Sequence, residues 1–357
     1  GRRFMRWSIG ERRFSRPVRW LVALLDQSLI PVVLEGTDPE IYSGNMSRGH
    51  RLYKDDVLIT SANKYVSILN KFGVQVDRAS RKHVILDSIE KTAQDLNAKP
   101  GLSDDLLEEL TDLVESPSLI KGEFEHSFLD LPAEVLSTVM RQHQRYVPLY
   151  LDNASMDPLL LNARKTLLPN FLCISNGLVD ARESIKIGNQ RVLRARFADA
   201  EFFVKADLST TSLDRSAKLS RVTFSEGLGT LLERVKRIEW ITRILIDQLD
   251  ILDFNTQDAL RAAHLCKNDL VSQMVGEFPE LQGIMGAKYL LAEGEKREVA
   301  LAVLEHYLPK GAGDMLPESD AGAVLAIAER IELLLCIFAK GERPSGSSDP
   351  YALRRAG

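Results

Sequence analysis

Cysteine is scarce in this sequence, with three in 357 residues. Cys173, Cys266 and Cys336 are far apart and form no CxxC pair, which argues against a disulfide framework. No apolar run approaches the roughly 18 to 20 residues that a membrane-spanning helix needs. The first residues are basic and aromatic, unlike a secretory signal. We therefore expect a soluble, intracellular protein whose cysteines are buried, reduced thiols.

The signatures of several common catalytic sites are also missing. The sequence has no GxxxxGK[ST] loop, no strand-linked GxGxxG, no GxSxG and no HExxH. Its net charge of −4 does not by itself predict nucleic-acid binding, so such a function depends on local basic clusters. With 45% hydrophobic and 27% charged residues, the composition is that of a globular protein, and 357 residues suffice for two or three domains.

The first part of the chain has the pattern of mixed α and β structure. Short β-type runs alternate with polar turns and predict strands at 31–36, 56–60, 82–87, 145–150 and 171–175. Residues 103–115 place leucines on one face at helical spacing, with Ser103 as the expected N-cap. This mixed pattern continues to about residue 207.

Helical periodicity dominates the rest of the chain. Helices are predicted at 230–249, 256–275, 287–308 and 321–340. Thr230 and Glu233 have the spacing of a capping box, and Gly341 is a fitting stop after the last helix. The sequence predicts an α+β fold and a fragment of a longer protein. Its expected parts are a mixed domain at 1–207, a helical domain at 208–345, and a linker with the start of a truncated domain at 346–357.

One acidic residue stands out in the stretch NDLVSQMVGEFPELQGIMG at 268–286. Asp269 falls on a partly apolar helical face, where a lone carboxylate needs a partner. It is either part of a metal-binding or phosphate-directed site, or a buried acid satisfied by backbone N–H groups or by an arginine such as Arg234 or Arg330. His306, in LEHYLP, is likewise either a catalytic residue or part of a helix end.

Basic clusters are the clearest positive signal. The first twenty residues contain seven arginines against one acid, interleaved with aromatic residues, a combination that suits phosphates and exposed bases. These arginines are Arg2, Arg3, Arg6, Arg12, Arg13, Arg16 and Arg19. Alternatively, they pair with acids elsewhere in the fold. RQHQRY at 141–146 and GNQRVLRARFADAEFF at 188–203 are further clusters, and either could instead be a solvated or ion-paired face.

A set of longer motifs resembles one known family. The motifs are MRW…RFSRPVRWLVALL (5–25), RGHR (48–51), VMRQHQRYVPLY (139–150), LLPNFLCISNG (167–177), GNQRVLRARFADAEFF (188–203), EGLGTLLERVKRI (226–238), NDLVSQMVGEFPELQGIMG (268–286), EHYLP (305–309) and RPSGSSDPYALRRAG (343–357). In this order, over essentially the whole chain, they closely resemble the β subunit of bacterial-type glycyl-tRNA synthetase, in a cyanobacterial or plastid form. So many long motifs together are far more specific than any one of them.

The resemblance implies an accessory subunit of a ligase. In that family two small α and two large β subunits form a heterotetramer. The α subunit carries the class II active site, where ATP with Mg²⁺ and glycine bind, and the β subunit contributes recognition of tRNA(Gly). This chain is expected to have no catalytic residues, to bind no cofactor or metal, and to contact no membrane. The expected location is the bacterial cytoplasm, or a chloroplast or mitochondrion if the origin is organellar.

The resemblance also implies details of fold. It predicts a mixed α/β module related to the editing module of phenylalanyl-tRNA synthetase, followed by a helical HD-like domain. An active HD phosphohydrolase has a His, a His-Asp pair and a distant Asp, and the corresponding positions here are Leu231, Asn268, Asp269 and Glu329. Only Asp269 is unchanged, so a metal site is not expected. Asp269 is then expected to stabilise turns near the glycines at 276, 283 and 286.

Candidate tRNA contacts come from the basic clusters. They are Arg141, His143, Arg145, Arg191, Arg194, Arg196, Arg215, Lys218 and Arg221. Two alternative functions stay open from the sequence: an HD-type metal phosphohydrolase built on the helical part, and hydrolytic editing of mischarged tRNA by the α/β part. The first needs bound metal, and the second needs deacylation activity.

Overall fold

The chain folds into short strands followed by an increasing share of helix, and it is of the α+β class. The computed structural model describes residues 4–6, 13–53, 56–177, 181–248, 256–344 and 349–357. Its contacts divide the chain into two compact units. The first comprises Gly1–Phe124, Met140–Asp152 and Leu168–Val192, and the second comprises Glu125–Val139, Asn153–Leu167 and Leu193–Gly357.

The first unit begins with short strands in small sheets. They are β1 (Met5–Arg6), β2 (Arg13–Phe14), β3 (Leu21–Val22), β4 (Leu24–Leu25), β5 (Ser28–Leu29), β6 (Val33–Leu34), β7 (Ile41–Gly44), β8 (Met46–Arg48) and β9 (Asp56–Leu58), followed by η1 (Ala62–Lys64) and α1 (Tyr65–Lys71). β3, β7 and β6 form one sheet, with β3 parallel and β6 antiparallel to β7, and the other strands pair as β1–β2, β4–β5 and β8–β9. Val57, Ile59 and Leu69 form the core of this region.

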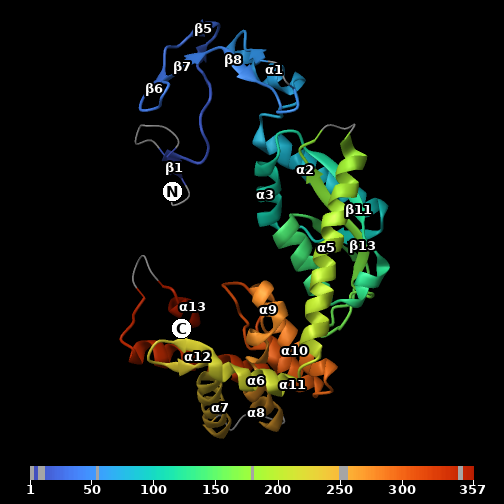
Figure 1. Cartoon of the computed structure of the whole chain (residues 1–357), viewed down its shortest axis with the longest axis vertical. Coiled ribbons are helices and arrows are strands. Elements are labelled where there is room, and N and C mark those ends of the chain that lie inside the picture. The colour runs from blue at the N-terminus through green and yellow to red at the C-terminus, as the bar shows by residue number, and fades with distance from the viewer. Residues whose placement is uncertain (1–3, 7–12, 54–55, 178–180, 249–255, 345–348) are drawn as a thin grey trace. The chain divides into compact units, whose positions relative to one another are not determined.

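A four-stranded sheet in the order β10-β12-β13-β11 forms the rest of the first unit. Its strands and helices are β10 (Ala98–Pro100), β11 (Ser118–Glu123), β12 (Val147–Leu151), β13 (Leu167–Ser175), α2 (Arg78–Asp95), α3 (Asp104–Leu113) and α5 (Arg182–Leu208). Leu172 packs in one core with residues of α2 and α3, whereas Cys173 accepts a hydrogen bond from Asn189 of α5 at 3.1 Å. Because successive strand residues point to opposite faces, α2 and α3 cover one face of the sheet and the first part of α5 the other (Figure 1).

The predicted strand at 82–87 is wrong, because these residues lie inside α2. The helix begins after Asp77, whose carboxylate accepts a hydrogen bond from the backbone N–H of Ser80 at 2.7 Å. Ile85 and Ile89, four residues apart, are both buried in the core against the sheet. The packing of this helical stripe outweighs the strand preference of the β-branched run.

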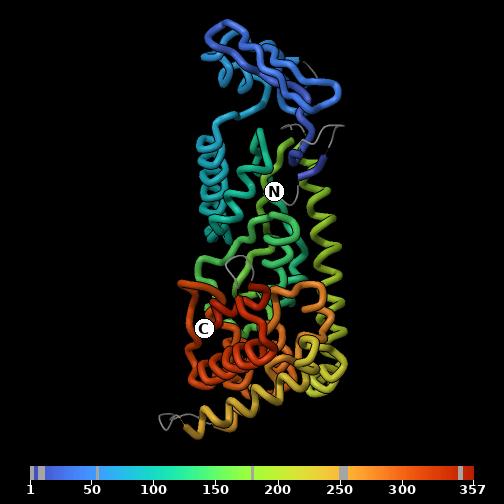
Figure 2. Tube along the Cα trace, turned by 90° about the vertical axis from the view of Figure 1, so that its left-hand side faces the viewer, coloured from blue at the N-terminus to red at the C-terminus, as the bar shows by residue number. Residues whose placement is uncertain are grey.

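The second unit is mostly helical. Its elements are η2 (His126–Asp130), α4 (Ala133–Thr138), α6 (Ser212–Lys218), η5 (Leu219–Arg221), β14 (Thr223–Ser225), β15 (Gly229–Thr230), α7 (Leu231–Gln248), α8 (Thr256–Leu265), η6 (Asn268–Val271), α9 (Gln273–Glu277), η7 (Pro279–Leu281), α10 (Ile284–Ala292), α11 (Arg297–Glu305), α12 (Asp320–Ala339) and α13 (Leu353–Ala356). The π-helix η3 (Val139–His143) follows α4, and its residues from Met140 onward belong to the first unit. The helices α10, α11 and α12, orange to red in Figure 2, share one hydrophobic core with α7 and α8. Ile238, Leu290, Val303 and Leu325 are fully buried there.

Local capping signals are confirmed. The N–H of Glu233 donates to Oγ1 of Thr230 at 3.3 Å, and the N–H of Thr230 donates to Oε2 of Glu233 at 2.7 Å, which is the predicted capping box of α7. Ser103 accepts a hydrogen bond from the N–H of Leu106 as the N-cap of α3. Gly341, with φ 84°, ends α12 as predicted.

Two predicted helices are shorter than expected. In place of one helix at 287–308, α10 and α11 are separated by a turn in which Gly294 has φ 90°, a conformation that favours glycine. The helix expected at 256–275 ends at Leu265 and is followed by η6 and α9. Among the described residues, no helix is both long and apolar enough to cross a membrane.

The predicted domain limits stay a prediction. The boundary between 1–207 and 208–345 falls at the C-terminal end of α5, and residues 193–208 of that helix belong to the second compact unit. Of the predicted segment 346–357, residues 346–348 lie outside the described residues, and the remainder contains α13.

All three cysteines are free thiols, as expected. Cys173 and Cys266 are buried, and Cys336 is partly buried. Burial raises the pKa of the Cys266 thiol to about 12 and that of Cys173 to about 11. Both thiols are therefore protonated and unreactive at neutral pH.

Candidate functional site

Three titratable side chains meet in the interior of the second unit. Lys267, at the N-cap of η6, is 1% exposed, and its Nζ lies 2.9 Å from Nε2 of His306 and 3.2 Å from Oε1 of Glu329. The same ammonium lies 3.9 Å from the centre of the Tyr307 ring. His306 directly follows α11 and Glu329 lies within α12, so the contact joins three elements that are distant in sequence.

A second cation reaches Glu329 from α7. Nη2 of Arg234 donates to Oε1 of Glu329 at 2.7 Å, and its Nε donates to Oε2 of Glu332 at 2.8 Å. Glu332 also accepts a hydrogen bond from Nε of Arg237 at 2.9 Å. Each buried carboxylate is therefore next to at least one cation, as burial of charge requires. We call Lys267, His306, Glu329, Arg234 and Glu332 the buried charge cluster.

The hydrogen bonds of His306 fix which ring nitrogen carries the proton. Nδ1 lies 2.6 Å from the carbonyl oxygen of Val303, which can only accept, so Nδ1 carries the hydrogen. Nε2 then accepts a hydrogen bond from Lys267. Burial, reinforced by the charge of Lys267, lowers the pKa of His306 well below its ordinary value. The imidazole is therefore neutral at neutral pH.

The pKa values of Glu329 and Lys267 are both lowered, but for different reasons. Burial alone would raise the pKa of Glu329, but Lys267 and Arg234 hold it at about 2. Burial lowers the pKa of Lys267, and Glu329 opposes that shift. The carboxylate is thus ionised because two cations surround it.

The donors around Lys267 are those of a cation site. A neutral imidazole nitrogen and a carboxylate oxygen are typical protein ligands of divalent metals such as zinc. Here both lie within hydrogen-bond distance of an ammonium that belongs to the chain itself. Within the described part of the chain, no group of three or more His, Cys, Asp or Glu side chains could hold a metal ion. The arrangement suits a structural charge cluster.

One carboxylate oxygen of Asp269 is held by backbone N–H groups, whereas its buried Oδ1 has no hydrogen-bond partner among the described residues. Asp269 is fully buried, and its Oδ2 accepts hydrogen bonds from the N–H of Gly283 at 2.6 Å and of Gly286 at 2.9 Å. Of the three glycines expected near turns that Asp269 stabilises, Gly283 and Gly286 donate to it, whereas the N–H of Gly276 donates to the carbonyl oxygen of Ser272. A Cβ atom at Gly286 would lie 2.9 Å from Oδ2, so only glycine permits this approach. Burial raises the pKa of Asp269, and the two backbone hydrogen bonds oppose that shift.

The four positions assigned by the HD resemblance do not converge as a set. Asn268 and Asp269 lie in η6, but Lys267, one residue earlier, contacts Glu329. Leu231 packs in a small hydrophobic cluster at the start of α7. Only Glu329 belongs to the buried charge cluster. The HD assignment of these positions stays a prediction.

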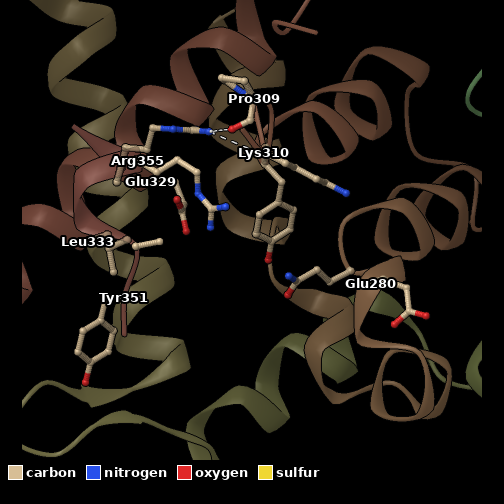
Figure 3. Close-up of a pocket in the computed structure, with 12 residues that line it drawn as sticks. Glu280, Pro309, Lys310, Glu329, Leu333, Tyr351 and Arg355 are labelled. Atoms are coloured by element: carbon tan, nitrogen blue, oxygen red, sulfur yellow. Dashed lines mark hydrogen bonds between the residues drawn. The ribbon is translucent and has the colours of Figure 1, made fainter. Parts of the chain in front are cut away.

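A pocket beside the cluster is lined by one of its members and by one neighbouring residue. Glu329 and Tyr307 line a cavity of about 370 Å³. Figure 3 shows Leu333 and Tyr351 on one side of it and Glu280 on the other. The pocket therefore gives Glu329 its remaining contact with solvent.

The whole chain matches one family. A family model described as "Glycyl-tRNA synthetase beta subunit" matches residues 1–357. The chain belongs to this family. The resemblance inferred from the motifs is confirmed.

Curated relatives named glycine–tRNA ligase beta subunit are similar along the same length. The identity is 48% over 357 residues with the protein from Acaryochloris marina, 46% over 357 residues with that from Trichodesmium erythraeum, and 40% over 352 residues with that from Listeria monocytogenes serovar 1/2a. The matches cover 100%, 100% and 99% of this chain, and 49% of each relative. The chain thus spans about half the length of these members of the beta subunit family.

Among the candidate tRNA contacts taken from the basic clusters of this beta subunit family member, Arg215 is buried rather than exposed. Its side chain is 2% exposed, and Nη1 donates to the carbonyl oxygens of Asp207 and Thr210, both at 2.5 Å. Nη2 donates to Glu293 at 3.0 Å, and the guanidinium lies over the ring of Tyr289. In the sequence Arg215 belongs to a basic cluster, but the turn after α5 buries it. We therefore omit Arg215 from the proposed contacts.

The other candidates lie at or near the surface. Lys218 and Arg221 of the same cluster are exposed, as are Arg191, Arg194 and Arg196 on α5. Arg194 pairs with Glu125, and Arg145 pairs with Glu109 at 2.6 Å. Arg141 is half-buried and His143 exposed, both in η3. A contact between tRNA and any of these residues stays a prediction for this beta subunit family member.

The sequence points to three members of the buried charge cluster, Arg234, His306 and Glu329, but not to the way they pair. Sequence reasoning does not single out Lys267, although this residue stands beside Asn268-Asp269, and it treats His306 without its partners. The one signal is a lysine directly after the apolar run that ends in Cys266. Arg234 is a predicted partner of Asp269, but it pairs with Glu329 and Glu332 instead.

Replacing His306 with Gln should flatten the pH dependence of stability below pH 6.5. The native pKa of His306 lies well below the ordinary 6.5. As the pH falls below 6.5, His306 is therefore protonated in the unfolded chain but stays neutral in the native state. Stability is therefore fully present above pH 6.5 and decreases below it. Between pH 7 and 5 the variant should lose up to about 2 kcal/mol less unfolding free energy than the wild type, measured by urea denaturation.

A matched control uses an exposed histidine. His83, whose side chain is 75% exposed and pairs with Asp87, is replaced with Gln in the same series. Parallel stability curves for wild type and His306→Gln would contradict a buried, neutral imidazole. The charged groups near His306 are Lys267, Glu329, Arg234 and Arg330.

Proposed function

We propose that this chain is the N-terminal to middle part of an accessory, tRNA-binding β subunit of glycyl-tRNA synthetase. It assists the ATP-dependent attachment of glycine to tRNA(Gly), the glycine–tRNA ligase reaction, in a complex of two α and two β subunits. The α subunit carries the active site and binds ATP and Mg²⁺, and this chain binds neither. The proposed location is the bacterial cytoplasm. The observation that carries the proposal is the family match over residues 1–357.

The proposal includes a domain arrangement. Residues 1–207 form a module related to the editing module of phenylalanyl-tRNA synthetase, and residues 208–345 form an HD-like domain without hydrolytic activity. The contact of Lys267 with His306 and Glu329 supports a scaffold role for the second domain. A hydrolytic metal there would meet the ammonium of Lys267 at the same donor atoms.

The proposed tRNA surface includes α5. This helix buries Leu193 and Phe197 on one side and exposes Arg191 and Arg196. Residues five apart on a helix point about 140° from each other, so the two arginines lie on different sides of α5. Neither is in an ion pair with another described residue, and each has its charge available to a phosphate.

Neutralising Arg191 or Arg196 should weaken tRNA binding in a salt-dependent way. For each phosphate that the variant no longer neutralises, the slope of log affinity against log salt should fall by about 0.7 to 0.9. The measurement is binding of tRNA(Gly) to the full-length protein carrying Arg191→Ala or Arg196→Ala over a salt series. In glycylation with the α subunit, the same variants should raise KM for tRNA more than they lower kcat, because they remove binding to the ground state.

Lys205→Ala is the matched control, because Lys205 is an exposed cation on α5 that already pairs with Glu201 at 2.8 Å. It should leave the salt slope unchanged. Unchanged slopes for both arginine variants would remove α5 from the tRNA surface. Full glycylation by the α subunit alone, without the β subunit, would overturn the proposed function itself.

A further inference from the structure

The first unit contains a pocket whose lining is unusually rich in arginine and aromatic residues. Its cavity of about 540 Å³ lies between the residues before β3, the end of β8, the following loop and α1. The charged and aromatic lining residues are Arg19, Trp20, Arg48, Arg51, Tyr53 and Tyr65. Glu115 is the acid among the lining residues. Pockets of about 300 to 1,000 Å³ are the usual size for small-molecule sites.

The loop that carries Arg51 and Tyr53 is firmly built. The N–H of His50 donates to the carbonyl oxygen of Phe72 at 2.8 Å, and a Cβ atom at Gly49 would lie 2.7 Å from Cβ of Phe72. Tyr53 packs edge-on against the Phe72 ring, with 6.5 Å between ring centres. The loop backbone at His50 therefore rests on the end of α1, and the Tyr53 ring is placed against Phe72 before any ligand binds.

The arginines of this pocket retain their charge for a ligand. Among the described residues, Arg19 and Arg51 have no ion pair, and both are exposed. Arg48 pairs with Asp56 at 3.5 Å, but both side chains are more than half exposed, so this pair is weak. The guanidinium of Arg48 also lies 5.4 Å from the centre of the Trp20 ring. The pocket is therefore electropositive.

Two aromatic rings of this pocket are partly exposed to solvent. Trp20 and Tyr53 are each 42% exposed, which is a large apolar area to leave in water. Rings next to free arginines are the composition with which proteins hold unpaired nucleotides, since bases stack on the rings and phosphates bind the guanidinium groups. An acidic peptide would use the arginines but would leave the rings without a partner.

The second-unit pocket beside Glu329 also has two tyrosines, Tyr307 and Tyr351, but one of its arginines is already engaged. It is also lined by cations, Lys310, Arg330 and Arg355. However, Arg330 donates to the carbonyl oxygens of Ala326 at 3.0 Å and Pro309 at 2.9 Å. Its N–H groups are therefore already used by the backbone. The first-unit pocket is thus the better-equipped site for a base with its phosphates.

We propose that the first-unit pocket binds an unpaired nucleotide of RNA, with the base against the rings of Trp20 and Tyr53 and the neighbouring phosphates on Arg19 and Arg51. This proposal rests on the proposed function in one respect, which is that the partner is RNA. The pocket lies outside the candidate tRNA contacts at 141–145, 191–196 and 218–221. It adds a single-strand binding site to a protein expected to hold a folded RNA.

The test measures binding of a fluorescein-labelled single-stranded RNA of about eight nucleotides, within the usual site size, to the full-length protein by anisotropy. Trp20→Ala should weaken binding by about tenfold, since stacking on one aromatic ring contributes roughly that factor or more. Trp20→Phe, which keeps a ring, should stay within about threefold of wild type. Arg19→Ala combined with Arg51→Ala should lower the salt slope by about 1.4, or about 0.7 for each phosphate contact on a single strand.

Arg16→Ala is the matched control, an exposed arginine three residues from Arg19 that does not line the pocket. Equal losses for Arg16→Ala and for the pocket variants would mean diffuse attraction and would overturn the proposal. So would wild-type affinity in Trp20→Ala and in the arginine double variant. If AMP competes for the pocket while the RNA binds elsewhere, the ligand is a free nucleotide and the RNA assignment is wrong. If the α5 variants lose tRNA binding but the pocket variants bind RNA like the wild type, the proposed function holds and the pocket proposal is wrong.

Discussion

Replacing Lys267 with Met is expected to lower the free energy of unfolding by about 3 to 5 kcal/mol, the usual cost of removing one partner of a buried ion pair. Methionine has a similar length, so the volume of the core changes little. The variant leaves His306 Nε2 without a donor and Glu329 with Arg234 as its nearest cation. The measurement is urea denaturation, followed by ellipticity and by tryptophan fluorescence.

A double variant separates charge from packing. Adding Glu329→Gln to Lys267→Met removes the carboxylate that the ammonium balanced, so the double variant should cost less than the two single variants summed, by at least about 1 kcal/mol. Lys205→Met is the exposed control, because Lys205 and its partner Glu201 have 71% and 43% of their side chains exposed, and its urea midpoint should stay near that of the wild type. Additive costs in the double variant would contradict the buried charge cluster as described.

Replacing Asp269 with Ala is expected to cost about 2 to 4 kcal/mol. The change leaves the buried N–H groups of Gly283 and Gly286 without their acceptor, and each unsatisfied donor costs about 1 to 3 kcal/mol. The loss of a buried carboxylate offsets part of this cost, because burial disfavours its charge. The same urea titration gives the value.

Asp269→Asn is the matched comparison for this site. The amide keeps one oxygen that can accept from Gly283 and Gly286, so it should retain at least half of the stability lost in Asp269→Ala. If Asp269→Asn is as unstable as Asp269→Ala, charge matters there rather than the acceptor. A cost below about 1 kcal/mol for Asp269→Ala would contradict its role in joining the two turns.

The features that sequence predicts well are local ones. The capping box of Thr230 and Glu233 depends on residues three apart, and the N-cap Ser103 depends on the turn that follows it. The partner of Asp269 is also foreseeable in kind, because a buried carboxylate must accept hydrogen bonds and the nearby glycines offer N–H groups. Such rules need no knowledge of which elements pack together.

The features that sequence misses depend on the tertiary fold. Lys267 meets His306 and Glu329 across 39 and 62 residues, and no periodicity in the sequence encodes those pairings. The run at 82–87 has the pattern of a strand, but in the fold it lies in α2, which buries Ile85 against the sheet. The sequence predicts Arg215 as a surface cation, but in the fold it donates to carbonyl oxygens of the turn after α5. In each case, burial by a distant segment decides the outcome.

The charge cluster around Lys267 also bears on how this part of the protein matures. Its central positive charge is the ammonium of Lys267, which is part of the polypeptide. Every molecule therefore carries this charge as soon as it is translated. A chelator cannot strip it, and shortage or competition among metal ions in the cell cannot change its occupancy. Placing this charge beside Glu329 therefore needs no loading step beyond folding itself.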